Sequence, residues 1–304
     1  MAKRNRIKLT KGDLIFEIFN TTLMILVLLV ILYPLWFVVI ASFSDSRFVT
    51  TGEVWLWPKG FHLGAYRRVF TNSRLLVSYR NTIIYTFVGT VLNIIVTVCL
   101  AYSLSRKDFK GRSFITLLMT ITMFFNGGLI PTYLCYKQLG LVNNPWVMIL
   151  PGLFTTYNTI LVRTYFDGQP FELQEAAMID GCSNFRILWN IMVPLSKPII
   201  AVMAIYYGVG HWNAYFDALV YITSDEYKPM SLILRDILVT VTASASGTEG
   251  NSTGGGEAGQ DELQKTGEVM KYAVIIISTV PVLCLYPFLQ KHFAKGVMLG
   301  AIKG

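Results

Sequence analysis

Six stretches of this 304-residue chain contain no Asp, Glu, Lys or Arg and are long enough to cross a lipid bilayer. A membrane-spanning helix needs about 20 predominantly apolar residues. Charged residues make up only 14% of the chain, whereas soluble domains carry roughly 25%. The sequence therefore predicts an all-α, polytopic membrane protein with six transmembrane helices. The predicted spans are 18–44, 81–105, 113–136, 138–162, 198–216 and 272–290.

Some of these spans contain residues that interrupt a helix. Gly127-Gly128 lies in the third span and Pro151 in the fourth. Membrane helices tolerate such breaks where neighbouring helices or water satisfy the freed backbone groups. We expect kinks or breaks at these positions.

The basic residues predict the orientation, because Lys and Arg in short loops resist translocation. With the N-terminus in the cytoplasm, basic clusters at 3–11, 106–112, 186–197 and 291–303 all fall on the inner side, and both termini are cytoplasmic. The net charge of +8 is then explained by topology and by attraction to lipid headgroups, so nucleic-acid binding is not needed. The first run exceeds the apolar region of a cleavable signal peptide.

The sequence offers no evident catalytic or metal chemistry. Its four cysteines lack metal-ligand spacing and fall in or beside predicted spans or on a cytoplasmic loop, so we expect neither a metal site nor a structural disulfide. The phosphate-binding pattern Gly-x-x-x-x-Gly-Lys-Ser/Thr is missing from the sequence, so the chain is not expected to hydrolyse ATP by that route. The cysteines are Cys99, Cys135, Cys182 and Cys284.

A polar helical segment lies in the predicted cytoplasmic loop 167–197, between the fourth and fifth spans. Pro170 is tolerated in a first helical turn, and Glu172 and Glu175 lie where the helix dipole favours negative charge. Gly181 is expected to end the helix, and a second short helix over 184–192 would return the chain to the membrane. Helical spacing predicts one common face for Leu173, Ala176, Ala177 and Asp180.

This segment has two interpretations. An amphipathic helix resting on lipid headgroups would show the same pattern of residues. A helix that docks on another protein would also need small side chains on one face, because these let a partner approach the backbone closely. The docking interpretation involves Glu175, Ala176, Ala177, Asp180, Gly181 and Pro194.

These residues resemble the EAA loop of permease subunits in ATP-binding-cassette (ABC) importers. Tyr33-Pro34 in the first span and His211-Trp212-Asn213 in the fifth are similar to sugar-importing permeases of the MalG-like family. The ending 293–304 is similar to a Gram-positive branch that contains LplC and YtcP and is linked to complex polysaccharide fragments, including uronic-acid oligosaccharides. The resemblance covers essentially the whole chain and implies one permease domain, 1–304, with the type I importer (MetI-like) fold.

The resemblance also implies a mechanism and partners. The chain would supply half of a sugar translocation path by alternating access, and a homologous second permease subunit would supply the other half. Two separate ATPase subunits would bind ATP and Mg and contact the Glu175 segment, so this chain needs no catalytic residue or cofactor. An extracellular solute-binding lipoprotein would deliver the oligosaccharide. The C-terminal tail would contact the ATPase through Ala301, Ile302 and Lys303.

Candidate substrate contacts are aromatic and amide side chains, because small-ligand sites combine apolar surfaces with a few convergent polar groups. Trp and Tyr also serve as anchors at membrane interfaces, so each residue has a second interpretation. The Gly- and Ser-rich segment 243–267 is expected to be a flexible external loop. The candidates are Trp212, Asn213, Tyr215, Phe216 and Asn126.

Three alternatives stay open on the sequence alone. The same fold could import a peptide, an amino acid or phosphate. A channel or an ion-coupled secondary transporter would need no ATPase. Ion coupling usually leaves ionisable residues inside the spans, and the six runs contain no acidic or basic residue apart from His211. A membrane enzyme would need paired carboxylates or a nucleophile motif within a span, and neither is found there.

Overall fold

The structure is a computed structural model that describes residues 10–71, 73–245 and 269–284. All regular secondary structure within these ranges is helical. The chain forms two compact units. Unit 1 comprises Met1–Val69 with Val241–Ile276, and unit 2 comprises Phe70–Thr240 with Ile277–Gly304.

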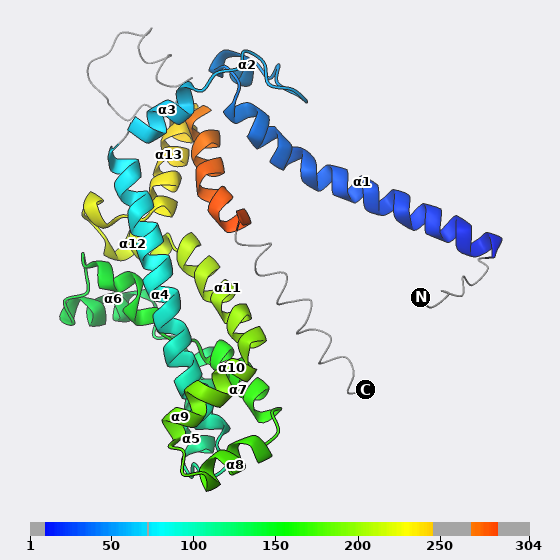
Figure 1. Ribbon diagram of the computed structural model, residues 1–304. Coiled ribbons are helices and arrows are strands. Elements are labelled where there is room, and N and C mark those ends of the chain that lie inside the picture. The colour runs from blue at the N-terminus through cyan, green and yellow to red at the C-terminus, as the bar shows by residue number, and fades with distance from the viewer. Residues whose placement is uncertain (1–9, 72, 246–268, 285–304) are drawn as a thin grey trace. The chain divides into compact units, whose positions relative to one another are not determined.

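Unit 1 is dominated by α1, Lys11–Ser42, a single helix of 32 residues (Figure 1). It begins with a capping box, in which Thr10 and Asp13 each satisfy the other's backbone N–H. Apolar side chains surround the helix on all sides and most are exposed, as expected of a helix whose solvent is lipid. Two shorter helices follow, α2 (Ser46–Thr50) and α3 (Gly64–Thr71).

The described residues contain two single helices that could cross a membrane, α1 and α4 (Ser73–Ser105). Three further candidates are pairs of helices bent at a short break, which gives up to five spans if each pair counts as one. The sixth predicted span is described only in part, within the helix Val269–Cys284. The bent pairs are Arg112–Phe124 with Leu129–Gln138, Pro145–Gly152 with Thr156–Asp167, and Asn184–Leu195 with Lys197–Asn213.

The third predicted run is not one straight helix. It divides into α5 (Arg112–Phe124) and α6 (Leu129–Gln138), which meet at 118°, so the break expected at Gly127-Gly128 is confirmed. Gly128 has φ +85°, a left-handed conformation that glycine adopts without steric cost. The Asn126 side chain stabilises this turn, because its Oδ1 accepts a hydrogen bond of 2.8 Å from the Gly128 N–H.

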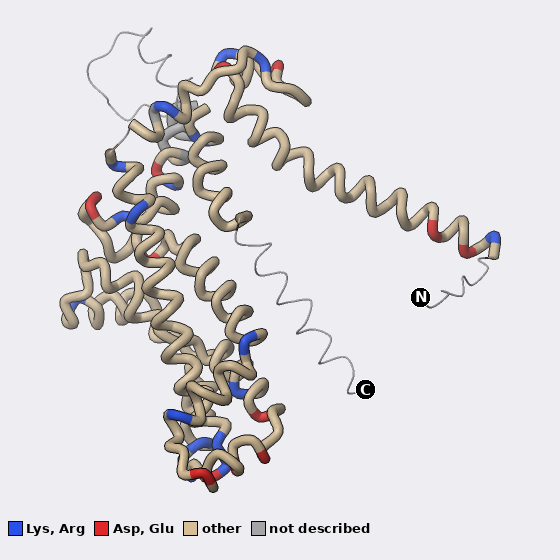
Figure 2. Tube along the Cα trace, viewed as in Figure 1, with Lys and Arg blue, Asp and Glu red and all other residues tan. Residues whose placement is uncertain are grey.

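Unit 2 is organised around α4, which packs against α7 (Thr156–Asp167) and α11 (Lys197–Asn213). Charged residues gather toward the two ends of this unit, and few lie between them (Figure 2). This distribution matches a bilayer, whose hydrocarbon core disfavours charge. The buried cluster between these helices includes Val98, Tyr102, Val162, Phe166, Met203 and Tyr207.

Polar side chains join α4 to α11 inside this core. Thr97 and Tyr207 share a hydrogen bond of 2.7 Å, and Asn93 Oδ1 lies 3.0 Å from His211 Nε2. Gly89 faces the His211 ring so closely that a Cβ at this position would lie 2.5 Å from Nε2. Polar groups of membrane helices are costly unless paired, so these pairs fix how the two helices pack.

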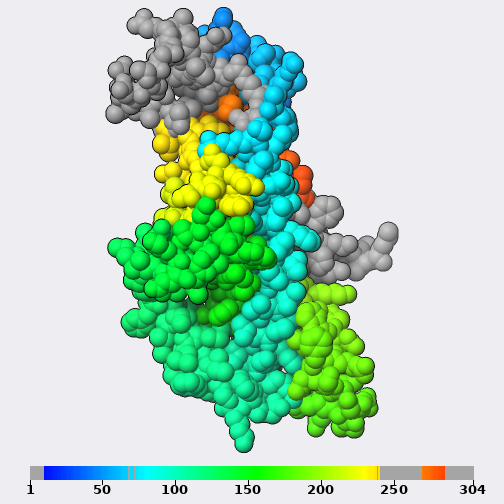
Figure 3. Space-filling view, turned by 90° about the vertical axis from the view of Figure 1, so that its left-hand side faces the viewer, coloured from blue at the N-terminus to red at the C-terminus, as the bar shows by residue number. Residues whose placement is uncertain are grey.

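A second cluster packs around the other half of α4, where Tyr85 meets residues of α6, η1 (Pro145–Met148) and α12 (Phe216–Tyr221). The green segment that contains α6 lies over α4 in the space-filling view (Figure 3). The segment after α12 holds further regular structure, namely η4 (Asp225–Tyr227) and α13 (Met230–Ala245). The prediction of a flexible loop over 243–267 is wrong for 243–245, because these residues belong to α13. The remaining residues, 246–267, lie outside the described residues.

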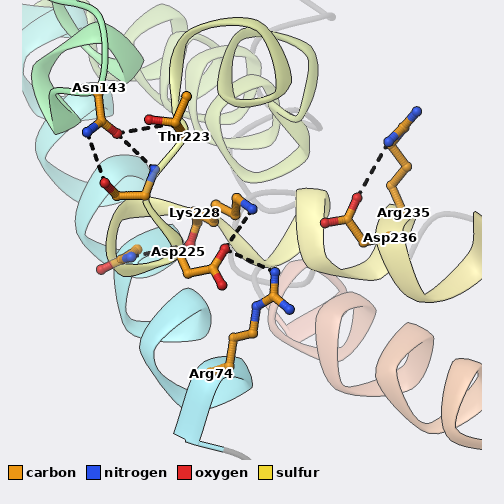
Figure 4. Close-up of polar contacts among 9 residues, drawn as sticks. Arg74, Asn143, Thr223, Asp225, Lys228, Arg235 and Asp236 are labelled. Carbon is orange, nitrogen blue, oxygen red and sulfur yellow. Dashed lines mark hydrogen bonds and ion pairs between the residues drawn. The ribbon is translucent and has the colours of Figure 1, made fainter. Parts of the chain in front are cut away.

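Polar contacts hold the segment after α12 in place (Figure 4). Asn143 accepts hydrogen bonds from the N–H groups of Thr223 (3.2 Å) and Ser224 (2.9 Å). Asp225 pairs with Arg74 (3.0 Å) and Lys228 (2.6 Å). The hydrogen bond from Lys228, with the charge of Arg74, lowers the pKa of Asp225 below its usual value. The ion pairs are therefore present at neutral pH and are lost only as the pH falls through that lowered pKa.

Removing Asn81 should destabilise this region more than removing the neighbouring ion pairs. The buried Asn81 amide donates to the carbonyls of Glu226 (2.6 Å) and Lys228 (3.2 Å). Asn81→Ala leaves both carbonyls without their donor, which costs about 1–3 kcal/mol. Asp225→Asn, which removes the ion pairs of a carboxylate that is 55% exposed, should have a smaller effect. Thermal unfolding of both variants in detergent measures the difference in stability. An equal decrease of the unfolding midpoint in both variants would contradict the prediction.

Candidate functional site

The predicted cytoplasmic loop 167–197 forms a chain of short helices between α7 and α11. The segment from Asn184 to Leu195 meets α11 at 85°, so the loop turns sharply before the chain re-enters the bundle. The elements are α8 (Glu172–Ile179), α9 (Asn184–Ile187), η3 (Leu188–Met192) and α10 (Val193–Leu195).

The α8 helix ends as the sequence predicts, at Gly181. Gly181 has φ +76°, and its N–H donates to the carbonyl of Met178 at 3.0 Å. The next N–H, of Cys182, donates to the carbonyl of Ala177 at 2.9 Å. These two bonds make a Schellman motif, in which a left-handed residue lets two otherwise unpaired carbonyls be satisfied.

Gly181→Ala should loosen the end of α8. A Cβ at Gly181 would meet no atom within 4 Å, so the cost is conformational and amounts to about 1–2 kcal/mol. Gly168→Ala is the matched control, because Gly168 caps α7 with φ −82° and has room for a Cβ. Hydrogen exchange of the α8 amides and thermal unfolding in detergent should both separate the two variants. Equal protection in both would contradict the prediction.

The two faces of α8 have different environments. Gln174 and Ala177 are each 6% exposed and face the protein core. The prediction that Ala177 lies on the docking face is therefore wrong, because its side chain belongs to the buried core cluster that also contains residues of α7, α9 and α11. The opposite face is exposed and combines acidic and apolar side chains, namely Glu172, Leu173, Glu175, Ala176, Ile179 and Asp180.

Two exposed apolar side chains, one on α8 and one on α9, were not among the residues selected from the sequence. Ile179, at the last position of α8, is 80% exposed, and Phe185 on α9 is 71% exposed. Their positions in short polar helices gave no periodic signal, so the sequence alone could not distinguish them from core residues.

The second half of the loop is anchored in the core. Ile187, Leu188 and Met192 are at most 3% exposed, and η3 is a π-helical turn closed by the bond from the Val193 N–H to the Leu188 carbonyl. Pro194 follows directly, and proline lacks an N–H and crowds the carbonyl four residues earlier. A widened π turn accommodates such a residue within a helix.

The candidate substrate residues have different surroundings. Trp212 donates from Nε1 to the carbonyl of Ser278 (2.8 Å) and meets the Tyr79 ring edge to face, so it joins α11 to the helix Val269–Cys284. Asn213 donates to the Val209 carbonyl (3.0 Å) within α11. Tyr215 and Phe216 are exposed, whereas Asn126 belongs to the α5–α6 turn. The predicted tail contacts Ala301, Ile302 and Lys303 lie outside the described residues.

This arrangement presents a firmly anchored acidic and apolar helix face. Such a face can bind a partner protein and transmit its movement to α7 and α11, which the same core joins.

Comparison with known proteins identifies the family. Protein LplC of Bacillus subtilis is 37% identical over 304 residues, which is the full length of both chains. The polygalacturonan/rhamnogalacturonan transport system permease protein YtcP of the same organism is 36% identical over 95% of this chain and 99% of its own length. No protein-family model matches the chain.

Solved structures agree with these relatives. A chain from a bacterial ABC transporter involved in the import of the acidic polysaccharide alginate superposes with a TM-score of 0.85 and 32% identity, covering 95% of this chain and 100% of its own. The bacterial alginate ABC transporter in complex with an alginate pentasaccharide-bound periplasmic protein shares the fold, with a TM-score of 0.55 and 14% identity over 92% of this chain and 93% of its own. The chain therefore belongs to the permease subunits of ABC transporters that import carbohydrates, and it is a transport subunit and not an enzyme.

Proposed function

We propose that the chain forms one half of the translocation path of an importer for acidic oligosaccharides, and that α8 couples this path to ATP hydrolysis. The exposed acidic and apolar face of α8 carries the proposal. Gln174 and Ala177 on its inward face are buried in unit 2, as are Ile187, Leu188 and Met192 later in the loop. A partner that pulls on this face therefore moves helices and not a loose loop.

The proposal includes the membrane arrangement. Six spans form a single permease domain over 1–304, with both termini in the cytoplasm of a Gram-positive bacterium. Support comes from the positions of the basic clusters and from relatives in Bacillus subtilis. The cytoplasmic side then carries α8, and the opposite end of unit 2 faces outward.

The proposed partners follow from this arrangement. A homologous permease completes the path, two ATPase subunits bind ATP and Mg, and one of them receives Glu175 and its neighbours. The tail residues Ala301, Ile302 and Lys303 add a second ATPase contact. A solute-binding lipoprotein delivers the sugar from outside; support comes from the alginate transporter, which was solved in complex with an alginate pentasaccharide-bound periplasmic protein. ATP-driven closure favours one of two states of the path, which gives alternating access.

The proposed cargo is an oligosaccharide of uronic acids. Polygalacturonan is built from such sugars, and alginate is an acidic polysaccharide. Trp212, Asn213, Tyr215, Phe216 and Asn126 are proposed to line or support the path, with Trp212 in a supporting role because its indole N–H is already bonded within the chain.

The test is ATP hydrolysis by the complex reconstituted in liposomes with its ATPase and binding protein. We expect uronic-acid oligosaccharides to stimulate hydrolysis and neutral oligosaccharides of equal length to have little effect. Stimulation only by neutral sugars, or by a peptide, an amino acid or phosphate, would overturn the acidic cargo. Uptake without any ATPase subunit would overturn the coupling and favour a secondary transporter.

A further inference from the structure

The cytoplasmic end of α4 continues into a short basic segment, 106–111, that contacts Met178 on α8 and Phe171 directly before it. Arg106 is the first residue after α4, and its side chain is only 10% exposed. Its guanidinium binds the Asp108 carboxylate through two parallel hydrogen bonds, each of 2.9 Å. Such bidentate pairs fix orientation more firmly than a single bond. The same Nη2 lies 3.4 Å from the Met178 sulfur on α8.

The next residue of this segment contacts the other end of α8. The Lys107 ammonium lies 5.8 Å from the centre of the Phe171 ring, within the range of a cation–π contact. Phe171 and Met178 are seven positions apart, so they lie two turns apart on the same side of a helix. Two successive loop residues therefore hold α8 near both of its ends, and the outward face stays open.

The ion pair that organises this contact persists at neutral pH. The hydrogen bond from Arg106 lowers the pKa of the Asp108 carboxyl below its usual value. The contribution of this pair to stability is therefore lost only as the pH falls through that lowered pKa.

The segment that contacts α8 is also connected to the membrane helices. Arg106 follows α4 without a break, and α4 is bonded to α11 through Thr97 with Tyr207 and Asn93 with His211. We propose that Arg106 and Lys107 form a relay that makes the 167–197 loop and α4 move as one body, so that movement imposed on α8 reaches α11. This inference rests on the proposed function of α8 and assigns positioning roles to two residues outside the loop.

The first experiment measures how much sugar is moved for each ATP hydrolysed by the reconstituted complex. We expect Arg106→Gln to lower this ratio roughly fivefold, as mutations within coupling networks do. Arg106→Lys should lower it as well, because an ammonium cannot form the two parallel bonds. Lys110→Gln is the matched control, since Lys110 is exposed in the same segment and the charge change is equal. An unchanged ratio in Arg106→Gln would overturn the relay.

The second experiment tests whether the loop and α4 move together. Ser103 on α4 and Asn184 on α9 are exposed and line one groove of ≈ 520 Å³. Cysteines at both positions, in a chain without its native cysteines, can be joined by a flexible bis-maleimide. One rigid body predicts equal uptake before and after crosslinking of the same variant. Loss of uptake on crosslinking would overturn the relay, whereas failure of the wild-type chain to bind an ATPase would overturn the proposed function itself.

Discussion

Replacing Glu175 by alanine should nearly abolish sugar uptake while the chain still inserts and folds. Glu175 is exposed on α8, and its carboxylate has no hydrogen bond or ion pair within the described part of the chain. Removing this carboxylate should therefore change the free energy of unfolding of the isolated chain very little. In the complex, truncating one member of a buried charge pair costs about 2–5 kcal/mol, which corresponds to a roughly 30-fold or larger loss of affinity.

Two measurements test the Glu175→Ala prediction. Copurification with the ATPase subunit reports docking, and sugar uptake into liposomes reports coupling. Glu53→Ala is the matched control, because Glu53 is an exposed carboxylate that pairs with the exposed Lys59 and accepts a hydrogen bond from the exposed Thr51, and exposed pairs contribute little. Normal copurification and uptake in Glu175→Ala would show that this carboxylate contacts no ATPase. An equal loss of copurification and uptake in Glu175→Ala and Glu53→Ala would indicate a general effect of removing a negative charge.

The parts of this site that were predictable from sequence depend on local chemistry. Glu172 and Glu175 favour a helix start through the helix dipole, and Gly181 favours its end because glycine accepts positive φ. These causes act within a few residues, so the extent of α8 follows from the sequence. The break at Gly127-Gly128 was predictable for the same reason, since Gly128 adopts φ +85°.

Other features depend on contacts between distant residues. Ala177 and Ala176 are adjacent and chemically identical, and only packing against core residues such as Phe166 decides that Ala177 is buried. The linker expected at 243–267 overlapped the last three residues of α13, which ends at Ala245, because Ala243, Ser244 and Ala245 resemble the Gly- and Ser-rich sequence that follows them. The contact from Arg106 to Met178 joins residues 72 positions apart, and the sequence gives no local signal for such a pair.

Alanine substitutions at Phe166 and Phe185 should have different effects, the first on the stability of the chain and the second on its binding to the ATPase. Phe166 is 1% exposed, and its ring meets the Tyr102 ring edge to face with centres 6.4 Å apart. Phe166→Ala leaves a cavity at the junction of α4, α7 and the loop, and such a change costs about 3–5 kcal/mol. Thermal unfolding of the purified chain in detergent should show a clearly lower midpoint.

Phe185→Ala removes an equally large ring that is 71% exposed, so the free energy of unfolding should change by no more than about 0.5 kcal/mol. Its ring centre lies 6.1 Å from that of Trp189, and Phe185 lines the groove that also contains Ser103 and Asn184. In the complex, this variant should bind the ATPase more weakly, because an exposed aromatic ring buries a large apolar area on docking. A midpoint lowered as far as in Phe166→Ala would show that α9 is packed inward, and the docking surface would then reduce to α8 alone.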